Sequence, residues 1–246
     1  MNAQMTFVVG ALVMAGLVYL LVLGIRKAKE KRAEEALTIH AFAQQRGWRV
    51  ETPDSGDVRY RLYGRSPDGV EWTLAFDSDQ SSSSSSPKLT WRAEGLKAAR
   101  TELMIGSRRQ WAGFGSAPAK AAFAGARWLL GGISHTVADL SDFFEQATVS
   151  PYGSPAFREQ FVVAGRTPAV VRAVPERLEG MLLRWPREAG PQFKPGRSVS
   201  IWLNSDGLEV VSRIDAPPPA VVDHVVKIAT ALADAVHRTS YPRLAQ

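Results

Sequence analysis

Few residues in this chain are suited to catalysis or to metal binding. Its 246 residues include no cysteine, which excludes disulfides, zinc ribbons, iron–sulfur clusters and thiol nucleophiles. Two of the four histidines, His224 and His237, are thirteen residues apart on a predicted helix, a spacing that does not form a chelating pair. We interpret both as surface or boundary residues, and His40 as a surface or interface residue. The sequence therefore predicts neither a metal site nor a bound cofactor.

The familiar catalytic motifs are also missing from the sequence. The segment GPQFKPGRS at residues 190–198 is one residue too long for a P-loop, and it has Arg where that motif has Lys. No GxSxG nucleophile elbow occurs, and Ser134, His135 and Asp139 lie too close in sequence to favour the geometry of a catalytic relay. We predict no catalytic residue from these patterns.

The longest uncharged segment lies near the N-terminus and reads TFVVGALVMAGLVYLLVLGI, residues 6–25. A helix of about 20 residues spans about 30 Å, which is the thickness of the hydrocarbon layer of a membrane. A cleaved signal peptide fits less well, because residues 1–5 carry no Lys or Arg and no small-residue cleavage site precedes the charges that follow. The segment predicts a retained transmembrane helix.

A basic segment, RKAKEKR at residues 26–32, directly follows this helix. By the positive-inside rule it places residues 1–5 outside the membrane and the rest of the chain in the cytoplasm. The sequence thus predicts a single-pass protein of the bacterial plasma (inner) membrane, with a basic juxtamembrane helix over 26–46 and a cytoplasmic domain over 47–246. The charges expected to orient the anchor are Arg26, Lys27, Lys29, Lys31 and Arg32.

The formal net charge of +6 comes mostly from residues 26–32, which is why nucleic acid is not the expected partner. Basic residues interleaved with aromatic ones also occur between 88 and 134. An ordinary solvated face with the aromatic rings in the core is the favoured interpretation of this segment. If the segment instead binds an anionic surface, lipid headgroups are the preferred target because the anchor holds the domain at a membrane. The candidate contacts are Arg108, Arg109, Lys120 and Arg127.

The elements of the cytoplasmic domain follow from hydrophobic periodicity. Alternation over 58–63 and 70–76 around the turn residues 66–69 predicts a hairpin, and 199–203 with 208–214 predicts a second one. A strand is also expected over 88–92. Helices are predicted over 28–45, from Pro118 onward and over 136–147, and the Ser-rich segment 78–87 is expected to be a loop.

The last third of the chain is expected to contain a strand over 157–163, a helix over 168–183 that Pro175 and Gly180 make broken or short, and a final helix after the prolines at 217–219. Glu159 would share a face with Phe157 and Phe161 on that strand, and a solvated position is the favoured interpretation for it. The final helix carries an apolar stripe suited to packing on a sheet, formed by Val221, Val222, Val225, Ile228, Ala229, Leu232 and Val236.

These elements define an α+β class: a transmembrane helix, a helical stalk, and a mostly antiparallel sheet with helices packed on it. Strand–strand–helix patterns recur in 47–150 and 151–246, which is compatible with two halves.

The anchor with its basic flank, the phrase FAQQRGW at 42–48 and the phrase FREQFVV at 157–163 give the chain a layout that resembles a family of uncharacterised bacterial membrane-anchored proteins. The resemblance implies a membrane-tethered cytoplasmic domain and carries no catalytic residue. We expect a non-enzymatic protein that binds a protein partner or is an accessory subunit of a membrane complex. An anionic lipid- or phosphate-binding module and a membrane-bound hydrolase stay open as alternatives.

Overall fold

The computed structural model describes residues 3–53, 58–77, 87–96, 102–109, 143, 146–167, 171–172, 174–189 and 199–240. The chain divides into two compact units, Met1–Arg46 and Gly47–Gln246. The helix predicted from Pro118 and most of the one predicted over 136–147 lie outside the described residues, as do Lys120, Arg127 and residues 78–86 of the Ser-rich segment.

The first unit is one helix, α1 (Ala3–Gln45). It confirms the helix predicted over 28–45, which no Pro or Gly interrupts. Among the residues that the structure describes, no helix is both long enough and apolar enough to cross a membrane. The transmembrane assignment of residues 6–25 stays a prediction.

The second unit is built on one sheet, in which the described part of the chain contributes nine antiparallel strands. The spatial order is β1-β2-β3-β4-β9-β8-β5-β7-β6. This sheet, together with its helices, confirms the predicted α+β class. The strands are β1 (Arg49–Glu51), β2 (Val58–Arg65), β3 (Glu71–Asp77), β4 (Lys88–Glu94), β5 (Leu103–Ser107), β6 (Thr148–Ser150), β7 (Phe161–Gly165), β8 (Val199–Leu203) and β9 (Gly207–Arg213).

The order of the strands interleaves the two halves of the domain sequence. Strands β8 and β9, from residues 151–246, lie between β4 and β5, which come from residues 47–150. Each half therefore contributes strands to one continuous sheet, and their apolar faces share one core.

Both predicted hairpins are confirmed. In the first, Leu62 pairs with Leu74 across β2 and β3, and the turn closes through hydrogen bonds that Ser66 N donates to Val70 O (2.8 Å) and Gly69 N donates to Ser66 O (2.9 Å). In the second, Asn204 caps the turn between β8 and β9, because its side-chain oxygen accepts hydrogen bonds from the backbone N–H groups of the next residues.

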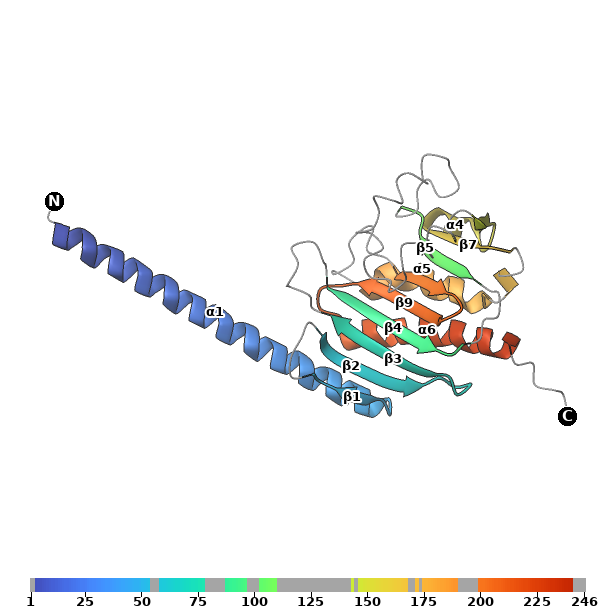
Figure 1. The fold of residues 1–246 in the computed structure, drawn as a ribbon, viewed down its shortest axis with the longest axis horizontal. Helices are drawn as coiled ribbons and strands as arrows, with labels where there is room; N and C mark the ends of the chain where they lie inside the picture. The colour runs from blue at the N-terminus through green and yellow to red at the C-terminus, as the bar shows by residue number, and fades with distance from the viewer. Residues whose placement is uncertain are drawn as a thin grey trace. The chain divides into compact units, whose positions relative to one another are not determined.

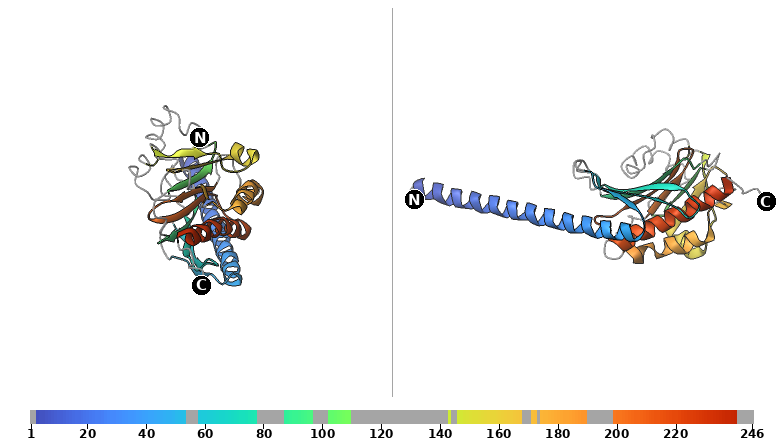
Figure 2. Two further views of the ribbon diagram at one scale, coloured as in Figure 1. Left: turned by 90° about the vertical axis from the view of Figure 1, so that its right-hand side faces the viewer. Right: turned by 90° about the horizontal axis from the view of Figure 1, so that it is seen from below.

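Two helices, α5 (Glu176–Ala189) and α6 (Pro219–Ser240), lie on one face of the sheet, as the two views in Figure 2 show. The predicted stripe of α6 is fully buried there, and α6 contacts β4 and β9 (Figure 1). On the sheet, the residues that alternate toward these helices are also buried, among them Leu62, Leu74, Trp91, Val210 and Ile201. This layer is the hydrophobic core of the domain.

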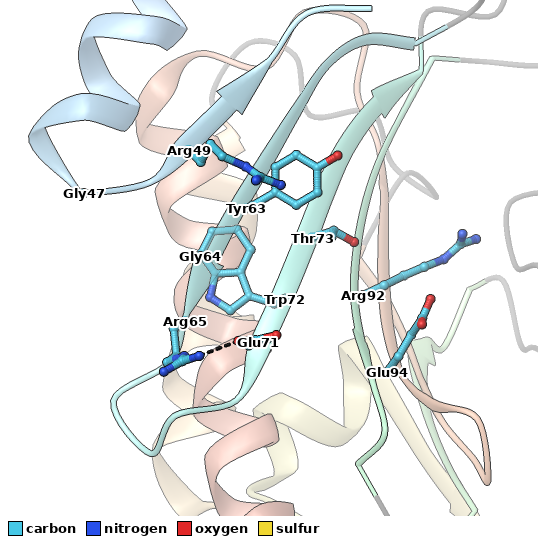
Figure 3. A pocket seen from close by; sticks show the side chains of 10 residues that line it. All are labelled: Gly47, Arg49, Tyr63, Gly64, Arg65, Glu71, Trp72, Thr73, Arg92 and Glu94. Carbon is cyan, nitrogen blue, oxygen red and sulfur yellow. Dashed lines mark hydrogen bonds and ion pairs between the residues drawn. The ribbon is translucent and has the colours of Figure 1, made fainter.

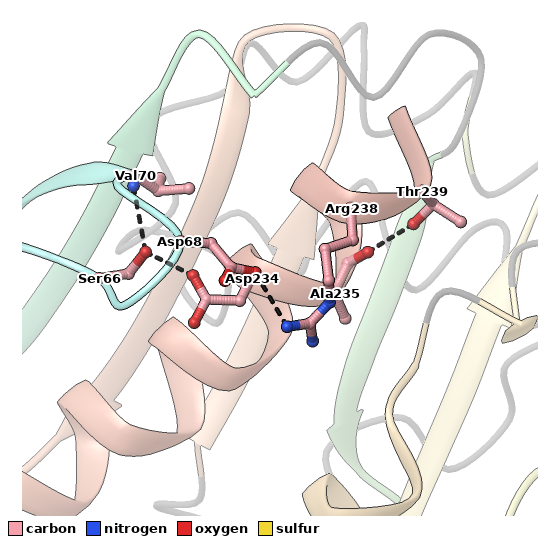
Figure 4. A network of polar contacts seen from close by, with 7 residues as sticks. All are labelled: Ser66, Asp68, Val70, Asp234, Ala235, Arg238 and Thr239. Atoms are coloured by element: carbon pink, nitrogen blue, oxygen red, sulfur yellow. Dashed lines mark hydrogen bonds and ion pairs between the residues drawn. The ribbon is translucent and has the colours of Figure 1, made fainter. Parts of the chain in front are cut away.

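A buried polar contact joins the first hairpin turn to α6 (Figure 4). Ser66 Oγ donates a hydrogen bond to Asp234 Oδ1 and accepts one from Val70 N at 3.1 Å. Nearby, Arg238 Nη1 lies 2.9 Å from Asp68 Oδ2. Since Ser66 and Asp234 are 6% and 3% exposed, their hydrogen bond satisfies two buried polar groups and sets the position of the turn on the helix.

Two predicted elements were wrong in the segment before β8. The strand expected over 157–163 is helix α4 (Pro155–Gln160) followed by β7. Ser154 starts α4 as its N-cap, accepting a hydrogen bond from Phe157 N at 3.3 Å, and Pro155 favours the first helical position. Glu159 is accordingly an exposed helical residue.

The helix expected over 168–183 also has different bounds. It begins at Glu176, directly after Pro175, and runs to Ala189 with Pro186 inside it. A proline disfavours helical geometry in the residue before it, so the helix starts beyond Pro175 instead of spanning it.

Candidate binding site on the open sheet face

A row of polar residues crosses five strands on the sheet face that points away from the core layer. The registers pair Arg49 with Tyr63, Tyr63 with Thr73, Thr73 with Arg92, and Arg92 with Glu209. Because side chains alternate across a strand, these residues point away from their buried neighbours such as Leu74 and Trp91. We call this row the polar row.

At one end of the polar row, Arg49 and Tyr63 form a stacked pair. The Arg49 guanidinium carbon lies 4.3 Å from the centre of the Tyr63 ring, a cation–π geometry. The Tyr63 hydroxyl donates a 2.5 Å hydrogen bond to Glu51 Oε2. That hydrogen bond raises the pKa of Tyr63, since ionisation would break it and bring two negative charges together, and partial burial acts in the same direction. The neutral, donating tyrosine holds Arg49 and Glu51 in place on β1.

At the other end, Arg92 binds the buried carboxylate of Glu209. Arg92 Nη2 and Nε lie 2.7 and 2.8 Å from Glu209 Oε1. The Glu209 side chain is 5% exposed and the Arg92 side chain 43% exposed. The pair therefore neutralises a charge inside the sheet while the guanidinium keeps an edge open to solvent.

Between these two pairs the surface is hollowed to a volume of about 640 Å³ (Figure 3). Arg65 and Glu71 form an ion pair at the hairpin end of the hollow. The lining residues come from β1 to β4 and the turn before β1, and are Gly47, Arg49, Tyr63, Gly64, Arg65, Glu71, Trp72, Thr73, Arg92 and Glu94.

Gly64 and Trp72 meet on the core-facing side of β2 and β3, where the absence of a side chain at Gly64 makes room for the indole. A Cβ there would lie 2.3 Å from the Trp72 ring, so only glycine lets the indole cross strand β2. Trp72 in turn packs against Trp48 and Trp91, with ring centroids 5.2 and 6.2 Å away. Trp72 and Trp91 are buried on the core side of the sheet, so this aromatic stack supports strands β2 to β4 from behind the hollow.

The described residues that line the hollow include neither histidine nor serine. Across the described residues, no cluster of three or more His, Asp or Glu side chains is arranged to hold a metal ion. The hollow offers guanidinium donors, carboxylates, the hydroxyls of Tyr63 and Thr73, and the face of the Tyr63 ring.

The structure describes some of the basic residues that the sequence predicted to bind an anionic surface or to orient the anchor. Arg108 and Arg109 are exposed in the turn after β5, and neither is among the residues that line the hollow. Lys88 and Arg92 form ion pairs with Asp77 (3.7 Å) and Glu209. Of the anchor charges, Arg26 and Lys27 are exposed on α1, and the side chains of Lys29, Lys31 and Arg32 lie outside those described.

Arg49 was not predicted as a site residue, because β1 has only three residues and shows no recognisable alternation. Alternation over 58–63 did place Tyr63 on the charged face of its hairpin, which was the available signal. The pairing of β1 with β2 is what brings Arg49 onto Tyr63.

The expectation that His224 is a surface or boundary residue was wrong. Its side chain is buried between α5 and α6, where Nε2 lies 2.9 Å from Met181 O and the ring stacks on Trp185 at 5.9 Å. The packing of α5 against α6 covers a helix position that the stripe pattern alone left at the boundary. His224 thus has a structural role.

Comparison of the chain with protein-family models, with curated proteins and with solved structures found no match.

Proposed function

We propose that the chain is a non-enzymatic, membrane-tethered protein whose domain binds a partner protein through the hollow of the polar row. The observation that carries this proposal is the pairing of Arg49 with Tyr63 beside a 640 Å³ hollow on the open sheet face. Arg, Tyr and Trp are the residues that most often dominate the binding energy of protein interfaces. Two of these types, Arg and Tyr, present side chains on this surface.

The charge of the hollow favours an acidic segment of the partner. Arg65 is paired with Glu71 and Arg92 with Glu209, whereas Arg49, within the described part of the chain, contacts the Tyr63 ring and no carboxylate. A guanidinium stacked on an aromatic ring keeps its N–H fork available for a carboxylate. A partner Asp or Glu at this position would complete the pairing of all three arginines.

Photo-crosslinking can identify the partner. A photoreactive amino acid at Thr73, which is exposed in the polar row, is expected to capture one discrete membrane-associated protein when the full chain is expressed in its host. With that protein purified, Arg49→Glu is expected to weaken the affinity by about 30-fold or more, the effect typical of a hot-spot arginine. The measurement is a binding titration in mild detergent.

Two variants serve as controls for this titration. Arg49→Lys keeps the charge but loses the planar fork, so an intermediate loss is expected. Arg172→Glu changes the same charge at an exposed residue that does not line the hollow, and its affinity should equal that of the natural chain. Equal binding by Arg49→Glu and Arg172→Glu would contradict the proposed site.

The membrane tether is supported by the uncharged run over 6–25 and the five basic residues in 26–32. If the positive-inside rule sets the orientation, a reporter that is active only in the cytoplasm should work when fused after Gln246. A reporter active only outside the membrane should be silent at the same position. The opposite pattern would reject the orientation, and partition of the full chain into the soluble fraction would reject the tether.

A further inference from the structure

Three arginines from two separate segments meet at one corner of the domain. Arg108 and Arg109 form the turn after β5, and Arg158 lies on α4. All three are exposed. We call this group the arginine corner.

Hydrogen bonds to main-chain oxygens join the two segments of the arginine corner. Arg108 N donates to Gln160 O at 2.8 Å, and Arg108 Nε donates to the main-chain oxygen of Arg158. Arg158 Nη1 in turn donates to Pro151 O at 3.2 Å. The two guanidinium groups are thus fixed on the main chain, and each retains further N–H donors that can reach a ligand.

The element that carries Arg158 is itself well anchored. The backbone N–H of its N-cap residue, Ser154, donates a 3.1 Å hydrogen bond to Glu179 Oε1 on α5. Phe157 of α4 is buried, and its ring stacks on Phe161 of β7 at 5.1 Å. A short helix tied at its start and packed along its length presents Arg158 in a defined position.

The arginine corner has an excess of positive charge. Among the described residues, none of its three guanidinium groups forms an ion pair with a carboxylate. The residue next to Arg158 in sequence, Glu159, is the acidic residue on α4. Three exposed cations on two joined segments, with no acidic partner among the described residues, attract an anion with several acceptor oxygens.

We propose that the arginine corner binds the phosphate groups of anionic lipid headgroups. Guanidinium forks match phosphate oxygens in geometry as well as in charge. Lipid is the source favoured here because the proposed tether would hold the domain at a membrane surface, where each basic side chain contributes to binding. The inference rests on that tether for proximity and is independent of the partner protein proposed for the hollow.

The absence of cysteine from the chain allows a direct test. Ala156 is exposed on α4, so Ala156→Cys provides a unique labelling site two residues from Arg158. The labelled full chain is mixed with vesicles of phosphatidylcholine alone, or with 30% phosphatidylglycerol, that carry an acceptor dye on their headgroups. Energy transfer is expected to be higher with the anionic vesicles. It should fall toward the neutral value between 0.1 and 1 M salt, where the screening length shrinks from about 10 to about 3 Å.

Matched variants locate the contact. Arg109→Gln with Arg158→Gln should abolish the extra transfer on anionic vesicles, because two surface charges change membrane partition by about 25-fold. Arg109→Lys with Arg158→Lys keeps the charges and should retain most of the signal. Arg61→Gln with Lys227→Gln removes the same number of charges at exposed positions that belong neither to the arginine corner nor to the lining of the hollow, and this control variant should behave as the natural chain.

Several outcomes would overturn this inference. These are equal transfer on neutral and anionic vesicles, loss of the signal in the control variant but not in the corner variant, or binding to an RNA oligonucleotide without any response to anionic lipid. If the chain fails to float with neutral vesicles, the tether is rejected. Energy transfer on anionic vesicles still measures lipid binding by the arginine corner in that case. Unchanged capture of the partner protein by the corner variant keeps the two proposals distinguishable.

Discussion

A chain that ends at Ala216 is expected to lose its cooperative fold, because α6 supplies one side of the core. The apolar stripe that includes Val222, Val225, Ile228 and Leu232 is fully buried. Full burial of each such side chain contributes about 1.5–3 kcal/mol, against a total stability of about 5–15 kcal/mol for a typical domain. The loss exceeds that margin. Near-ultraviolet circular dichroism and urea titration of the truncated and natural chains measure it.

A single change within α6 provides the graded control. Leu232→Ala is expected to cost about 2–5 kcal/mol and to leave a folded chain with a lower urea midpoint. Lys227→Ala, at an exposed position of the same helix, is expected to cost little by comparison. A truncated chain that stays monomeric, soluble and cooperatively folded would show that α6 is not part of the core, and its stripe would then be a candidate surface for a partner.

Replacement of Gly207, in the turn of the second hairpin, by alanine is expected to lower the free energy of unfolding substantially. Gly207 has a φ of +144°, and an added Cβ would lie 2.1 Å from the main-chain oxygen of Ala93 on the neighbouring strand β4. The backbone strain costs about 1–3 kcal/mol and the overpacking about as much again. The expected decrease in the free energy of unfolding is therefore about 2–6 kcal/mol, measured by chemical denaturation.

Gly69 separates the two causes of this loss. It also has a positive φ, +87°, but an added Cβ would meet no atom within 4 Å. Gly69→Ala should thus show the strain alone, about 1–2 kcal/mol. Equal losses for Gly69→Ala and Gly207→Ala would indicate that β4 moves to accommodate the methyl group, and that the close approach of the two strands is not required.

Local signals account for the elements that were predicted correctly. In both hairpins, alternation with period two and turn residues with matching backbone preferences lie within about a dozen residues of each other, so no distant contact is needed to define them. The same holds for α6, whose stripe recurs at helical spacing after a run of prolines. The two hairpins and α6, which packs against the sheet, can therefore be predicted from the sequence alone.

Short or fully buried elements escaped prediction for the opposite reason. Strand β5 is buried on both faces, so its residues LMIGS show no alternation, and a glycine within it suggests a loop. In the segment after Pro151, the N-cap at Ser154 outweighed an apparent alternation at Phe157, and a helix formed where a strand was expected. Periodicity describes the residues of one segment by themselves, whereas burial on both faces and helix capping depend on contacts with residues outside that pattern.

The sequence by itself determined the α+β class, the two hairpins, the final helix and the candidate status of Arg108 and Arg109. Tertiary structure alone decided which residues meet: β1 brings Arg49 onto Tyr63, β4 and β9 bring Arg92 onto Glu209, and α4 brings Arg158 beside Arg108. The physical reason is that periodicity states which face of an element is apolar but not which element lies next to it. The order of strands in the sheet arises from long-range pairing, and both candidate surfaces exist only once that pairing is made.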